Sequence, residues 1–541
     1  MLRLTEIKLP LDHPDADLRA AVLKRLGVRA TDLIGYTVFR RGYDARKKSD
    51  IHFVYTVDCE VRDEPAVLKR LEDDRHCAVT PDMAYRYVAQ APADLTERPV
   101  VIGLGPCGLF AGLVLAQMGF RPIILERGKA VRERTQDTWG LWRKGKLNPE
   151  SNVQFGEGGA GTFSDGKLHS QIKDPAYRGR KVLTEFVEAG APPEIVWVSK
   201  PHIGTFKLVG MVERMREKIR ALGGEVRFQA RVEDFEIERG EDGQGQVRAV
   251  ILADGERLAT RHVVLAVGHS ARDTFYQLFD RGVHMEAKPF SIGFRIEHPQ
   301  SLIDQARFGR FAGHPALGAA DYKLVHHCGN GRSVYSFCMC PGGTVVAATS
   351  EEGRVVTNGM SQYSRNERNA NAALVVGITP EKDYPGHPLA GIELQRRLEE
   401  AAFKAGGGTY AAPAQKVGDF IAGRPSTELG SVVPSYTPGV HPTDLAQCLP
   451  EFAITAIREA LVAFGRQIRG FDMNDALLTG VETRTSSPIR ITRDRASYQS
   501  LNTRGLYPAG EGAGYAGGIL SAAVDGIEVA EAVALDMVKP A

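Results

Sequence analysis

Three glycines near residue 103 follow an apolar run at a spacing that suits phosphate chemistry. Val100–Ile102 leads into Gly103-x-Gly105-x-x-Gly108. In such a turn Gly103 permits a tight bend, Gly105 lets the backbone approach a pyrophosphate, and Gly108 lets a helix pack closely on a strand. The chain contains 58 glycines, so the spacing alone is a weak signal. The flanking residues decide its meaning.

The flanking residues have the order of a dinucleotide-binding unit. A helical pattern covers Leu109–Met118, and a second apolar run, Pro122–Leu125, ends on Glu126. A helix N-terminus favours a pyrophosphate, and an acid at this distance accepts hydrogen bonds from a ribose. The sequence therefore predicts a bound dinucleotide. Further contacts are expected from Pro106, Cys107 and Arg127.

A second strand–glycine–helix pattern lies near the end of the chain. Gly505–Ile519 reads GLYPAGEGAGYAGGI and precedes a helical pattern over Leu520–Ala534. It resembles the C-terminal signature of FAD-dependent oxidoreductases, in which an acid binds the ribityl chain and a helix N-terminus faces the flavin. That acid is usually Asp, and this chain has Glu511. The resemblance implies contacts from Gly510, Glu511, Gly518 and Ile519.

A third segment, Arg261–His269, resembles the strand and glycine that precede the substrate domain of the same superfamily. It implies that Gly268 and His269 face the cofactor. The first motif alone does not distinguish FAD from NAD. Three motifs in this order favour FAD.

A glycine-dense loop, Phe155–Leu168, follows the first motif. Its backbone amides could reach the cofactor without steric cost, or it could be an ordinary flexible loop; its position favours contact. The expected contacts are Gly159, Ala160, Gly161 and Thr162. Val232 is either a backbone contact to adenine or simply a strand residue.

The candidates for catalysis are one histidine, two cysteines and one arginine. His202 could protonate a substrate as hydride leaves the flavin, or it could satisfy a backbone group at a helix start. Cys338 and Cys340 could relay electrons, although residues i and i+2 of a strand could simply pack on one face; packing is favoured. Arg484, with Arg490 and Arg493, could bind a substrate carboxylate or phosphate, or the cluster could bridge two domains.

Composition limits the function classes. The 541 residues have a net charge of +2 and are 43% hydrophobic, which gives no general electrostatic argument for nucleic acid or membrane binding. No run approaches the ~20 apolar residues of a membrane span. Seven cysteines without regular spacing do not suggest a disulfide framework. A cytoplasmic protein is expected, and no metal site is predicted.

The chain divides by pattern into an N-terminal module (1–95), a first FAD-domain part (96–285), an inserted domain (286–485) and a closing FAD-domain part (486–541). The module shows a β-α-β-β-α-β order, typical of ferredoxin-like α+β folds. Its predicted elements are Leu2–Leu9, Asp15–Leu26, Ile34–Arg40, Ile51–Val61, Pro65–Glu72 and Met83–Ala89.

The inserted domain is predicted to be a largely antiparallel β substrate domain. Its short β-like runs are Phe290–Ile296, Ser333–Cys338 and Thr344–Ser350, and its helical patterns are Gly391–Lys404 and Glu451–Phe464. The sequence contains no second strand–GxGxxG–helix unit for a stable NAD(P)H domain. A nicotinamide would therefore dock transiently.

Several motifs together resemble one bacterial family. The stretches FGEGGAGTFSDGKL, PHIGT, SFCMCPGG, ETRTSSPIR and YPAGEGAGYAGGI are similar to those of FAD-dependent dehydrogenases with an N-terminal appendage, a family without an assigned reaction. The resemblance covers nearly the whole chain. It implies bound FAD, a glutathione-reductase-type Rossmann-like α/β domain and cytoplasmic location.

The expected function is transfer of a hydride or electron pair between FAD and a small organic substrate, with NAD(P)H or a protein as a transient electron donor. An RNA-modifying flavoprotein is an alternative, because residues 40–48 form a basic hairpin; a solvated hairpin tip is favoured over this. A non-catalytic protein stabilised by FAD is a third hypothesis. The sequence predicts neither the substrate nor the oligomeric state.

Overall fold

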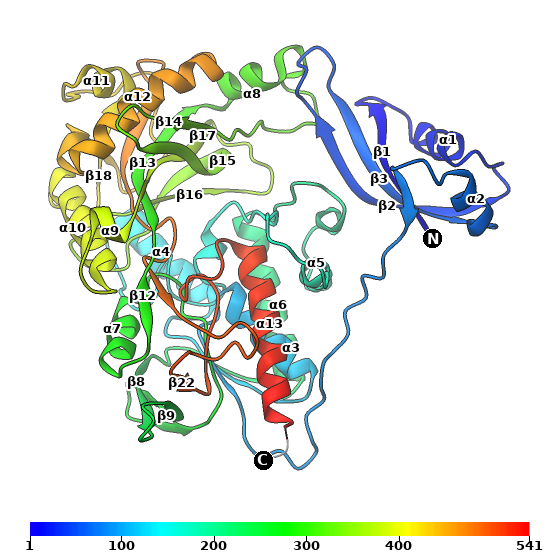
Figure 1. Ribbon diagram of the computed structural model, residues 1–541. Helices are drawn as coiled ribbons and strands as arrows, with labels where there is room; N and C mark the ends of the chain where they lie inside the picture. The colour runs from blue at the N-terminus through cyan, green and yellow to red at the C-terminus, as the bar shows by residue number, and fades with distance from the viewer. Residues whose placement is uncertain (540–541) are drawn as a thin grey trace.

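A five-stranded parallel sheet brings the three glycine motifs to one edge. The structure is a computed structural model that describes residues 1–539 (Figure 1). The strand order is β23-β11-β5-β6-β7, and each neighbouring pair is parallel. These strands are β5 (Val100–Ile102), β6 (Ile123–Leu125), β7 (Glu225–Arg227), β11 (Val263–Leu265) and β23 (Leu506–Pro508).

Helices cover one face of this sheet. They are α3 (Pro106–Gln117), α5 (Arg178–Glu188), α6 (Thr205–Ala221) and α13 (Ile519–Met537). Helix α3 is apolar all round because it lies between the sheet and α13. A Cβ at Gly526 would lie 2.2 Å from the Cys107 carbonyl oxygen, so α13 crosses α3 at a residue that must be glycine. Because the two helices pack so closely here, their relative positions are fixed, and so are the positions of their N-termini.

A small sheet covers the other face. It consists of β8 (Val232–Arg239), β9 (Gly245–Leu252), β10 (Arg257–Ala259) and β22 (Thr503–Arg504). Its apolar residues share a core with β5, β11 and α7 (Arg272–Asp280). The five-stranded parallel sheet is therefore covered on both faces, as parallel sheets usually are.

Residues 290–482 contribute the strands of an eight-stranded sheet. Its order is β14-β15-β17-β13-β20-β18-β19, and β16 also pairs with β15; only β18 and β19 are parallel. The strands are β13 (Phe290–Pro299), β14 (Val325–His327), β15 (Ser333–Ala347), β16 (Thr357–Ser361), β17 (Asn369–Ile378), β18 (Ala412–Lys416), β19 (Val440–Pro442) and β20 (Leu477–Glu482).

The two predicted runs within 333–350 are one strand, β15, which ends at Ala347. Two irregularities interrupt its pairing with β17, on either side of Cys340. The sequence pattern breaks there because Pro341, Gly342 and Gly343 follow. Helices α10 (Ala390–Ala405) and α12 (Glu451–Gln467) pack on this domain, close to their predicted bounds.

Short elements complete the fold. Strands β12 (Met285–Ala287) and β21 (Ile489–Ile491) pair where the chain enters and leaves the inserted domain. The remaining helices are α4 (Val131–Lys144), α8 (Gln300–Phe308), α9 (Pro380–Asp383) and α11 (Val417–Ala422), with 3-10 turns η1 (Ala160–Phe163), η2 (Pro193–Val196), η3 (Gly309–Phe311) and η4 (Leu445–Gln447). No helix within residues 1–539 is both long and apolar enough to cross a bilayer.

The N-terminal module is a separate antiparallel sheet of order β2-β3-β1-β4. Its elements are β1 (Leu2–Pro10), α1 (Asp15–Leu26), β2 (Leu33–Asp44), β3 (His52–Val61), α2 (Glu64–Arg70) and β4 (Cys77–Val79). The predicted strand Met83–Ala89 is wrong, because β4 completes the sheet earlier. Residues 83–89 instead run along the parallel-sheet domain, where Tyr85 and Ala89 pack on the core formed by its helices.

The β2–β3 hairpin reaches toward α8 (Figure 1). The amide of Arg41 donates to the Trp197 carbonyl at 2.6 Å, and the Tyr43 ring packs edge-on against Phe308. Arg310 donates to the Ser49 carbonyl at 2.8 Å. The hairpin is therefore partly docked on the body of the protein, although Lys47 and Lys48 are exposed.

Candidate active-site cavity

A cavity of about 800 Å³ lies at the carboxyl edge of the parallel sheet, against the inserted domain. Ligand sites span about 300–1,000 Å³, and open α/β sheets bind ligands at this edge. Residues from these segments line it: 102–107, 125–127, 154–171, 230–232, 266–271, 321–323, 336–339, 482–485 and 509–522.

The three glycines of the first motif have different structural roles. A Cβ at Gly103 (φ +98°) would lie 2.3 Å from the Ala266 carbonyl oxygen, and one at Gly108 would lie 1.9 Å from that of Gly103. A Cβ at Gly105 would touch only the Gly159 Cα, at 3.6 Å. Gly103 and Gly105 line the cavity, whereas Gly108, predicted as a cofactor contact, is a packing residue outside the described lining.

Two helices begin at this cavity without a side-chain cap. Gly105 is the N-cap of α3 and Gly518 is the N-cap of α13. First-turn N–H groups have no partner within a helix, and helix N-termini attract anions. Pro106, Cys107 and Ile519 line the cavity from these first turns, and Gly510 (φ +71°) lines it from the preceding loop. The space beside Gly105 therefore fits a phosphate group.

Glu126 is buried beside this turn and lines the cavity. Its carboxylate accepts N–H bonds from Leu104, Gly128 and Gly156, each at 2.9 Å. A carboxylate has about four acceptor positions, so capacity remains for a ribose hydroxyl. Arg127 also lines the cavity, but its guanidinium donates to Glu150 and Asp273 rather than standing free.

The glycine-dense loop is held by a buried arginine that the sequence did not suggest. Arg134 donates to the carbonyls of Asn152, Val153, Glu157 and Gly159 at 2.7–2.9 Å. The flexible-loop alternative is therefore not supported. Gly159, Ala160 and Gly161 line the cavity, while Thr162, a predicted contact, lies buried beneath it.

Val232, Gly268 and His269, which are predicted cofactor contacts, line the cavity. Gly268 (φ +72°) has open space where a Cβ would be. Burial, and then the charges of Arg484 and Arg272, lower the pKa of His269 to about 3. His269 is therefore a neutral ring at neutral pH.

Arg484 lines the cavity, but its guanidinium is fully engaged by Glu399 and Ser350 of its own domain and by Ser270 of the other. Its Nε and NH2 groups donate to Glu399 at 3.1 and 3.0 Å, and its NH1 group donates to Ser270 and Ser350. Arg272 donates to the other side of Glu399 at 2.8 Å. These contacts favour the bridging interpretation over substrate binding. Arg490 is exposed and Arg493 pairs with Asp525, so the three arginines do not gather.

Cys338 and Cys340 lie at the wall that the inserted domain contributes. Cys338 lines the cavity and has an unusual φ of +44°, while Cys340 is fully buried behind it. The Cys340 thiol donates to the Cys338 carbonyl at 3.4 Å. Arg295 donates to the same carbonyl at 2.6 Å. Both thiols are free.

Glu482, a residue not predicted for the site, has an unpaired oxygen beside Cys338. Its Oε1 accepts from Arg295 at 3.0 Å, and its Oε2 is buried with no hydrogen-bond partner in the described chain. Burial, and then the charge of Cys338, raise the pKa of Glu482 to about 7 against the opposing effect of Arg295. The sequence feature that could have identified Glu482 as a site residue is its position in ETRTSSPIR, at the end of a buried strand.

Glu511 also lines this end of the cavity. Burial raises its pKa to about 7, although Lys288 opposes the shift. His202 lies outside the described lining: its Nε2 bonds the Tyr363 carbonyl at 2.9 Å and its ring stacks on Tyr363. The catalytic prediction for His202 is therefore not supported, because its ring is used to join two loops.

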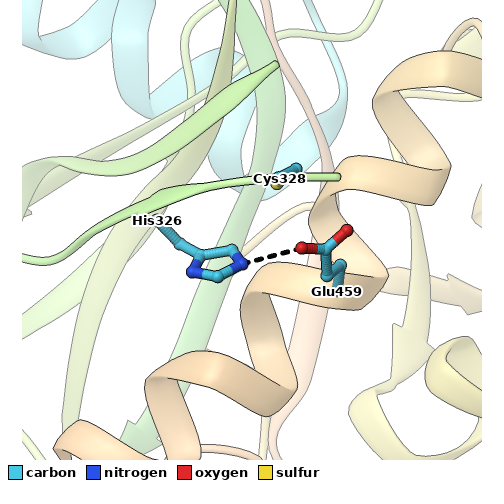
Figure 2. Close-up of side chains that lie close together, drawn as sticks. All are labelled: His326, Cys328 and Glu459. Carbon is cyan, nitrogen blue, oxygen red and sulfur yellow. Dashed lines mark hydrogen bonds and ion pairs between the residues drawn. The ribbon is translucent and has the colours of Figure 1, made fainter. Parts of the chain in front are cut away.

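One further cluster has metal-ligand residue types (Figure 2). His326, Cys328 and Glu459 bring one ligand atom each within 4.8 Å, on β14, just beyond it, and on α12. His326 bonds Glu459 at 2.9 Å, and the Cys328 thiol donates to the Ala456 carbonyl at 3.4 Å. Each donor atom already has a protein partner, so we assign the cluster to the packing of β14 on α12.

The parallel sheet, its glycine turn and the acid at its second strand define a dinucleotide-binding fold. Residues 289–485 match the family described as "FAD-dependent protein, C-terminal domain-like", and residues 1–60 match a domain of unknown function. A protein of Clostridium beijerinckii, named "Uncharacterized protein", is 47% identical over 531 residues, which are 98% of each chain. This chain belongs to the same family, and FAD is its cofactor.

The solved structures that are similar to this chain match it only weakly. Glycerol-3-phosphate dehydrogenase from Bacillus halodurans, complexed with FAD, is 12% identical over 83% of this chain and 66% of its own, with a TM-score of 0.35. The L-amino acid deaminase from Proteus myxofaciens is 11% identical over 84% and 94%, with a TM-score of 0.34. THI4 from Thermovibrio ammonificans is 19% identical over 35% and 63%, with a TM-score of 0.24. These scores carry no argument about the reaction.

Proposed function

We propose that the protein is an FAD-dependent oxidoreductase that transfers a hydride or electron pair between FAD and a small organic substrate. One observation carries the proposal: a single cavity runs from the phosphate-type turn at Gly105 to Glu482, a buried acid on the wall that the inserted domain contributes. A purely structural cofactor would not need an acid with a pKa near neutrality at its far end.

The residues divide into holding and reacting groups. Glu126 would accept a ribose hydroxyl, and the first turns of α3 and α13 would face the pyrophosphate and the flavin. When bound, FAD supplies the hydride and electron chemistry. Glu482 would hold or release the proton that accompanies substrate oxidation or reduction, because its pKa lies near the working pH.

The substrate end of the cavity is polar. Lys167, His169 and Asn358 line it from the glycine-dense loop and β16. Lys200 also lines it, paired with Asp321 at 2.7 Å. This lining favours a substrate with its own polar groups over a hydrocarbon.

The test is an anaerobic absorbance titration of the purified holoprotein with NADH and with NADPH, followed by air. Bleaching of the flavin absorbance by a nicotinamide supports a reductase with a transient donor, and fast reoxidation in air favours an oxidase over a dehydrogenase. Bleaching by dithionite alone leaves the substrate or a protein as the electron source. A bound flavin that dithionite does not reduce would contradict the proposal and favour a structural cofactor.

The RNA-modifying alternative has no specific contact in its favour. Part of the basic hairpin docks on the protein body, and Arg46 pairs with Asp44. Arg484 and Arg493 also have carboxylate partners. Nucleic acid binding with a steep salt dependence would reopen this alternative.

A further inference from the structure

We propose that Cys338 and Cys340 form a redox-active dithiol that exchanges an electron pair with the bound flavin by reversible disulfide formation. The inference rests on the proposed function, because it requires FAD in the cavity. It adds a second two-electron group to the same site.

The two thiols differ in their access to the cavity. Cys338 lines the cavity, and Cys340 lies directly behind it with no exposed surface. An accessible thiol with a buried partner lets the first react and the second close the disulfide. The five other cysteines lie outside this wall, and Cys107, the one that also lines the cavity, belongs to the phosphate-type turn.

The backbone shortens the spacing between the two residues. In a regular strand the Cα atoms of i and i+2 are about 6.6 Å apart, near the upper limit of about 6.8 Å for a disulfide. Here three residue steps, from Phe337 to Cys340, face only two steps on β17, from Ala373 to Asn371. This bulge contracts the strand where the two cysteines lie.

The bulge is held in a conformation that a non-glycine residue rarely adopts. Cys338 at φ +44° costs about 1–2 kcal/mol relative to an ordinary conformation. Arg295, fully buried, fixes it by donating to the Cys338 carbonyl, and also lies 3.6 Å from the Cys340 sulfur. Such strain at a cavity wall points to function, because plain packing would not require it.

Charges around the pair favour one thiolate. The cations near the cysteine pair are Lys167 and Arg295, and the acids near it are Asp165, Glu482 and Glu511. The Cys340 thiol, as hydrogen-bond partner, and then the two cations lower the pKa of Cys338, while the same contact raises the pKa of Cys340. The reduced pair is thus a Cys338 thiolate beside a Cys340 thiol, which is the reactive form.

The electron balance needs no reagent besides FAD. The S–H bond of Cys340 breaks and an S–S bond forms between Cys338 and Cys340. The pair loses two electrons and one proton, and oxidised flavin takes up both, which is one hydride equivalent. The reverse direction reduces the disulfide at the expense of reduced flavin.

The first test counts electrons in the purified holoprotein. Anaerobic dithionite titration of the air-oxidised protein is expected to consume about four electrons per flavin in the wild type, and about two in Cys338→Ser and Cys340→Ser. Cys448→Ala is the matched control, because Cys448 is buried in the same domain outside the cavity lining. It should consume about four electrons, as the wild type does.

The second test needs no variant. Alkylation of the denatured wild type, read by mass spectrometry, should label all seven cysteines after full reduction and two fewer, Cys338 and Cys340, after oxidation in air. A wild type that consumes about two electrons and labels all seven cysteines in both states overturns the dithiol, while the proposed function stands if the flavin still bleaches. Protein that retains no flavin overturns both.

Discussion

The two ends of the cavity are built in different ways. At the phosphate end the contacts come from backbone N–H groups and glycines within short, continuous motifs around Gly105 and Gly518. At the inserted-domain end the wall includes the side chains of Cys338 and Glu482, and Arg295 from another strand donates to the Glu482 carboxylate and to the Cys338 carbonyl. The phosphate end therefore tolerates many side-chain substitutions but little added volume near its backbone. The inserted-domain end tolerates changes near its backbone but few side-chain substitutions.

The largest effect at the phosphate end is expected where a glycine lies tightly against the backbone. Gly108→Ala would place a Cβ 1.9 Å from the Gly103 carbonyl oxygen, so α3 must move away from β5. We expect a loss of about 3–5 kcal/mol in stability, seen as a lower melting temperature and less folded protein. An unchanged melting temperature would show that the turn is looser than its geometry indicates.

Gly105→Ala separates folding from binding at the same turn. Its Cβ would meet only the Gly159 Cα, at 3.6 Å, and its φ of −76° suits alanine. We expect a near-normal melting temperature for the flavin-free protein but at least about tenfold weaker FAD binding, because the methyl group enters the phosphate space. Full retention of FAD would place the pyrophosphate elsewhere in the cavity.

The next effect on stability is expected at the side-chain bridge between the domains. Glu399 is buried between Arg272 and Arg484. Glu399→Ala leaves two buried cations without their shared acid, which should cost about 3–5 kcal/mol. Glu400→Ala, which removes an exposed pair with Lys404, should leave the melting temperature close to that of the wild type. Equal melting temperatures for the two variants would contradict the bridging role.

A smaller effect is expected from Glu126→Gln. The amide would turn an NH2 group toward backbone N–H donors that now meet a carboxylate oxygen. We expect FAD affinity to fall by about 1–3 kcal/mol, or about 5–150-fold, as measured by titrating FAD into the flavin-free protein. Glu133→Gln, exposed on α4, is the control and should bind FAD normally. A wild-type affinity in Glu126→Gln would remove Glu126 from the site.

The same difference between the ends explains what the sequence could predict. Gly103, Gly105 and Glu126 lie within 24 residues, so one local pattern defines the phosphate end. Glu482 and its partner Arg295 are 187 residues apart in the sequence, and His202 and its partner Tyr363 are 161 residues apart. Without those partners, a buried acid and a histidine before a helix give no reliable signal. His202 was therefore predicted as catalytic and Glu482 was missed.

Arg134 shows the same limit inside the FAD domain. It lies on α4 and donates to two carbonyls of the glycine-dense loop and to two in the segment just before it. Nothing in its local sequence distinguishes it from the exposed Arg132 two residues earlier. Burial of a helix residue under a loop is decided by tertiary packing, which periodicity does not report.

The smallest expected effect is a pH dependence at the side-chain end. Burial raises the folded-state pKa of Glu482 to about 7, so the folded protein binds a proton that the unfolded chain releases above its ordinary pKa of 4.5. This contribution is fully present below pH 4.5 and is lost as the pH rises toward 7.

The pH effect can be isolated with Glu482→Gln, which carries no titratable group there. The stability difference between wild type and variant should move against the wild type by about 1–2 kcal/mol between pH 5 and pH 7.5. This is less than the full pKa difference would give, because part of the shift comes from the charge of Cys338. Melting temperatures of the holoproteins across this range measure it. A constant stability difference would mean that Glu482 is ionised throughout this pH range, because the charge of Arg295 outweighs the effect of burial. Glu482 would then be a fixed anion at the cavity wall rather than a proton carrier.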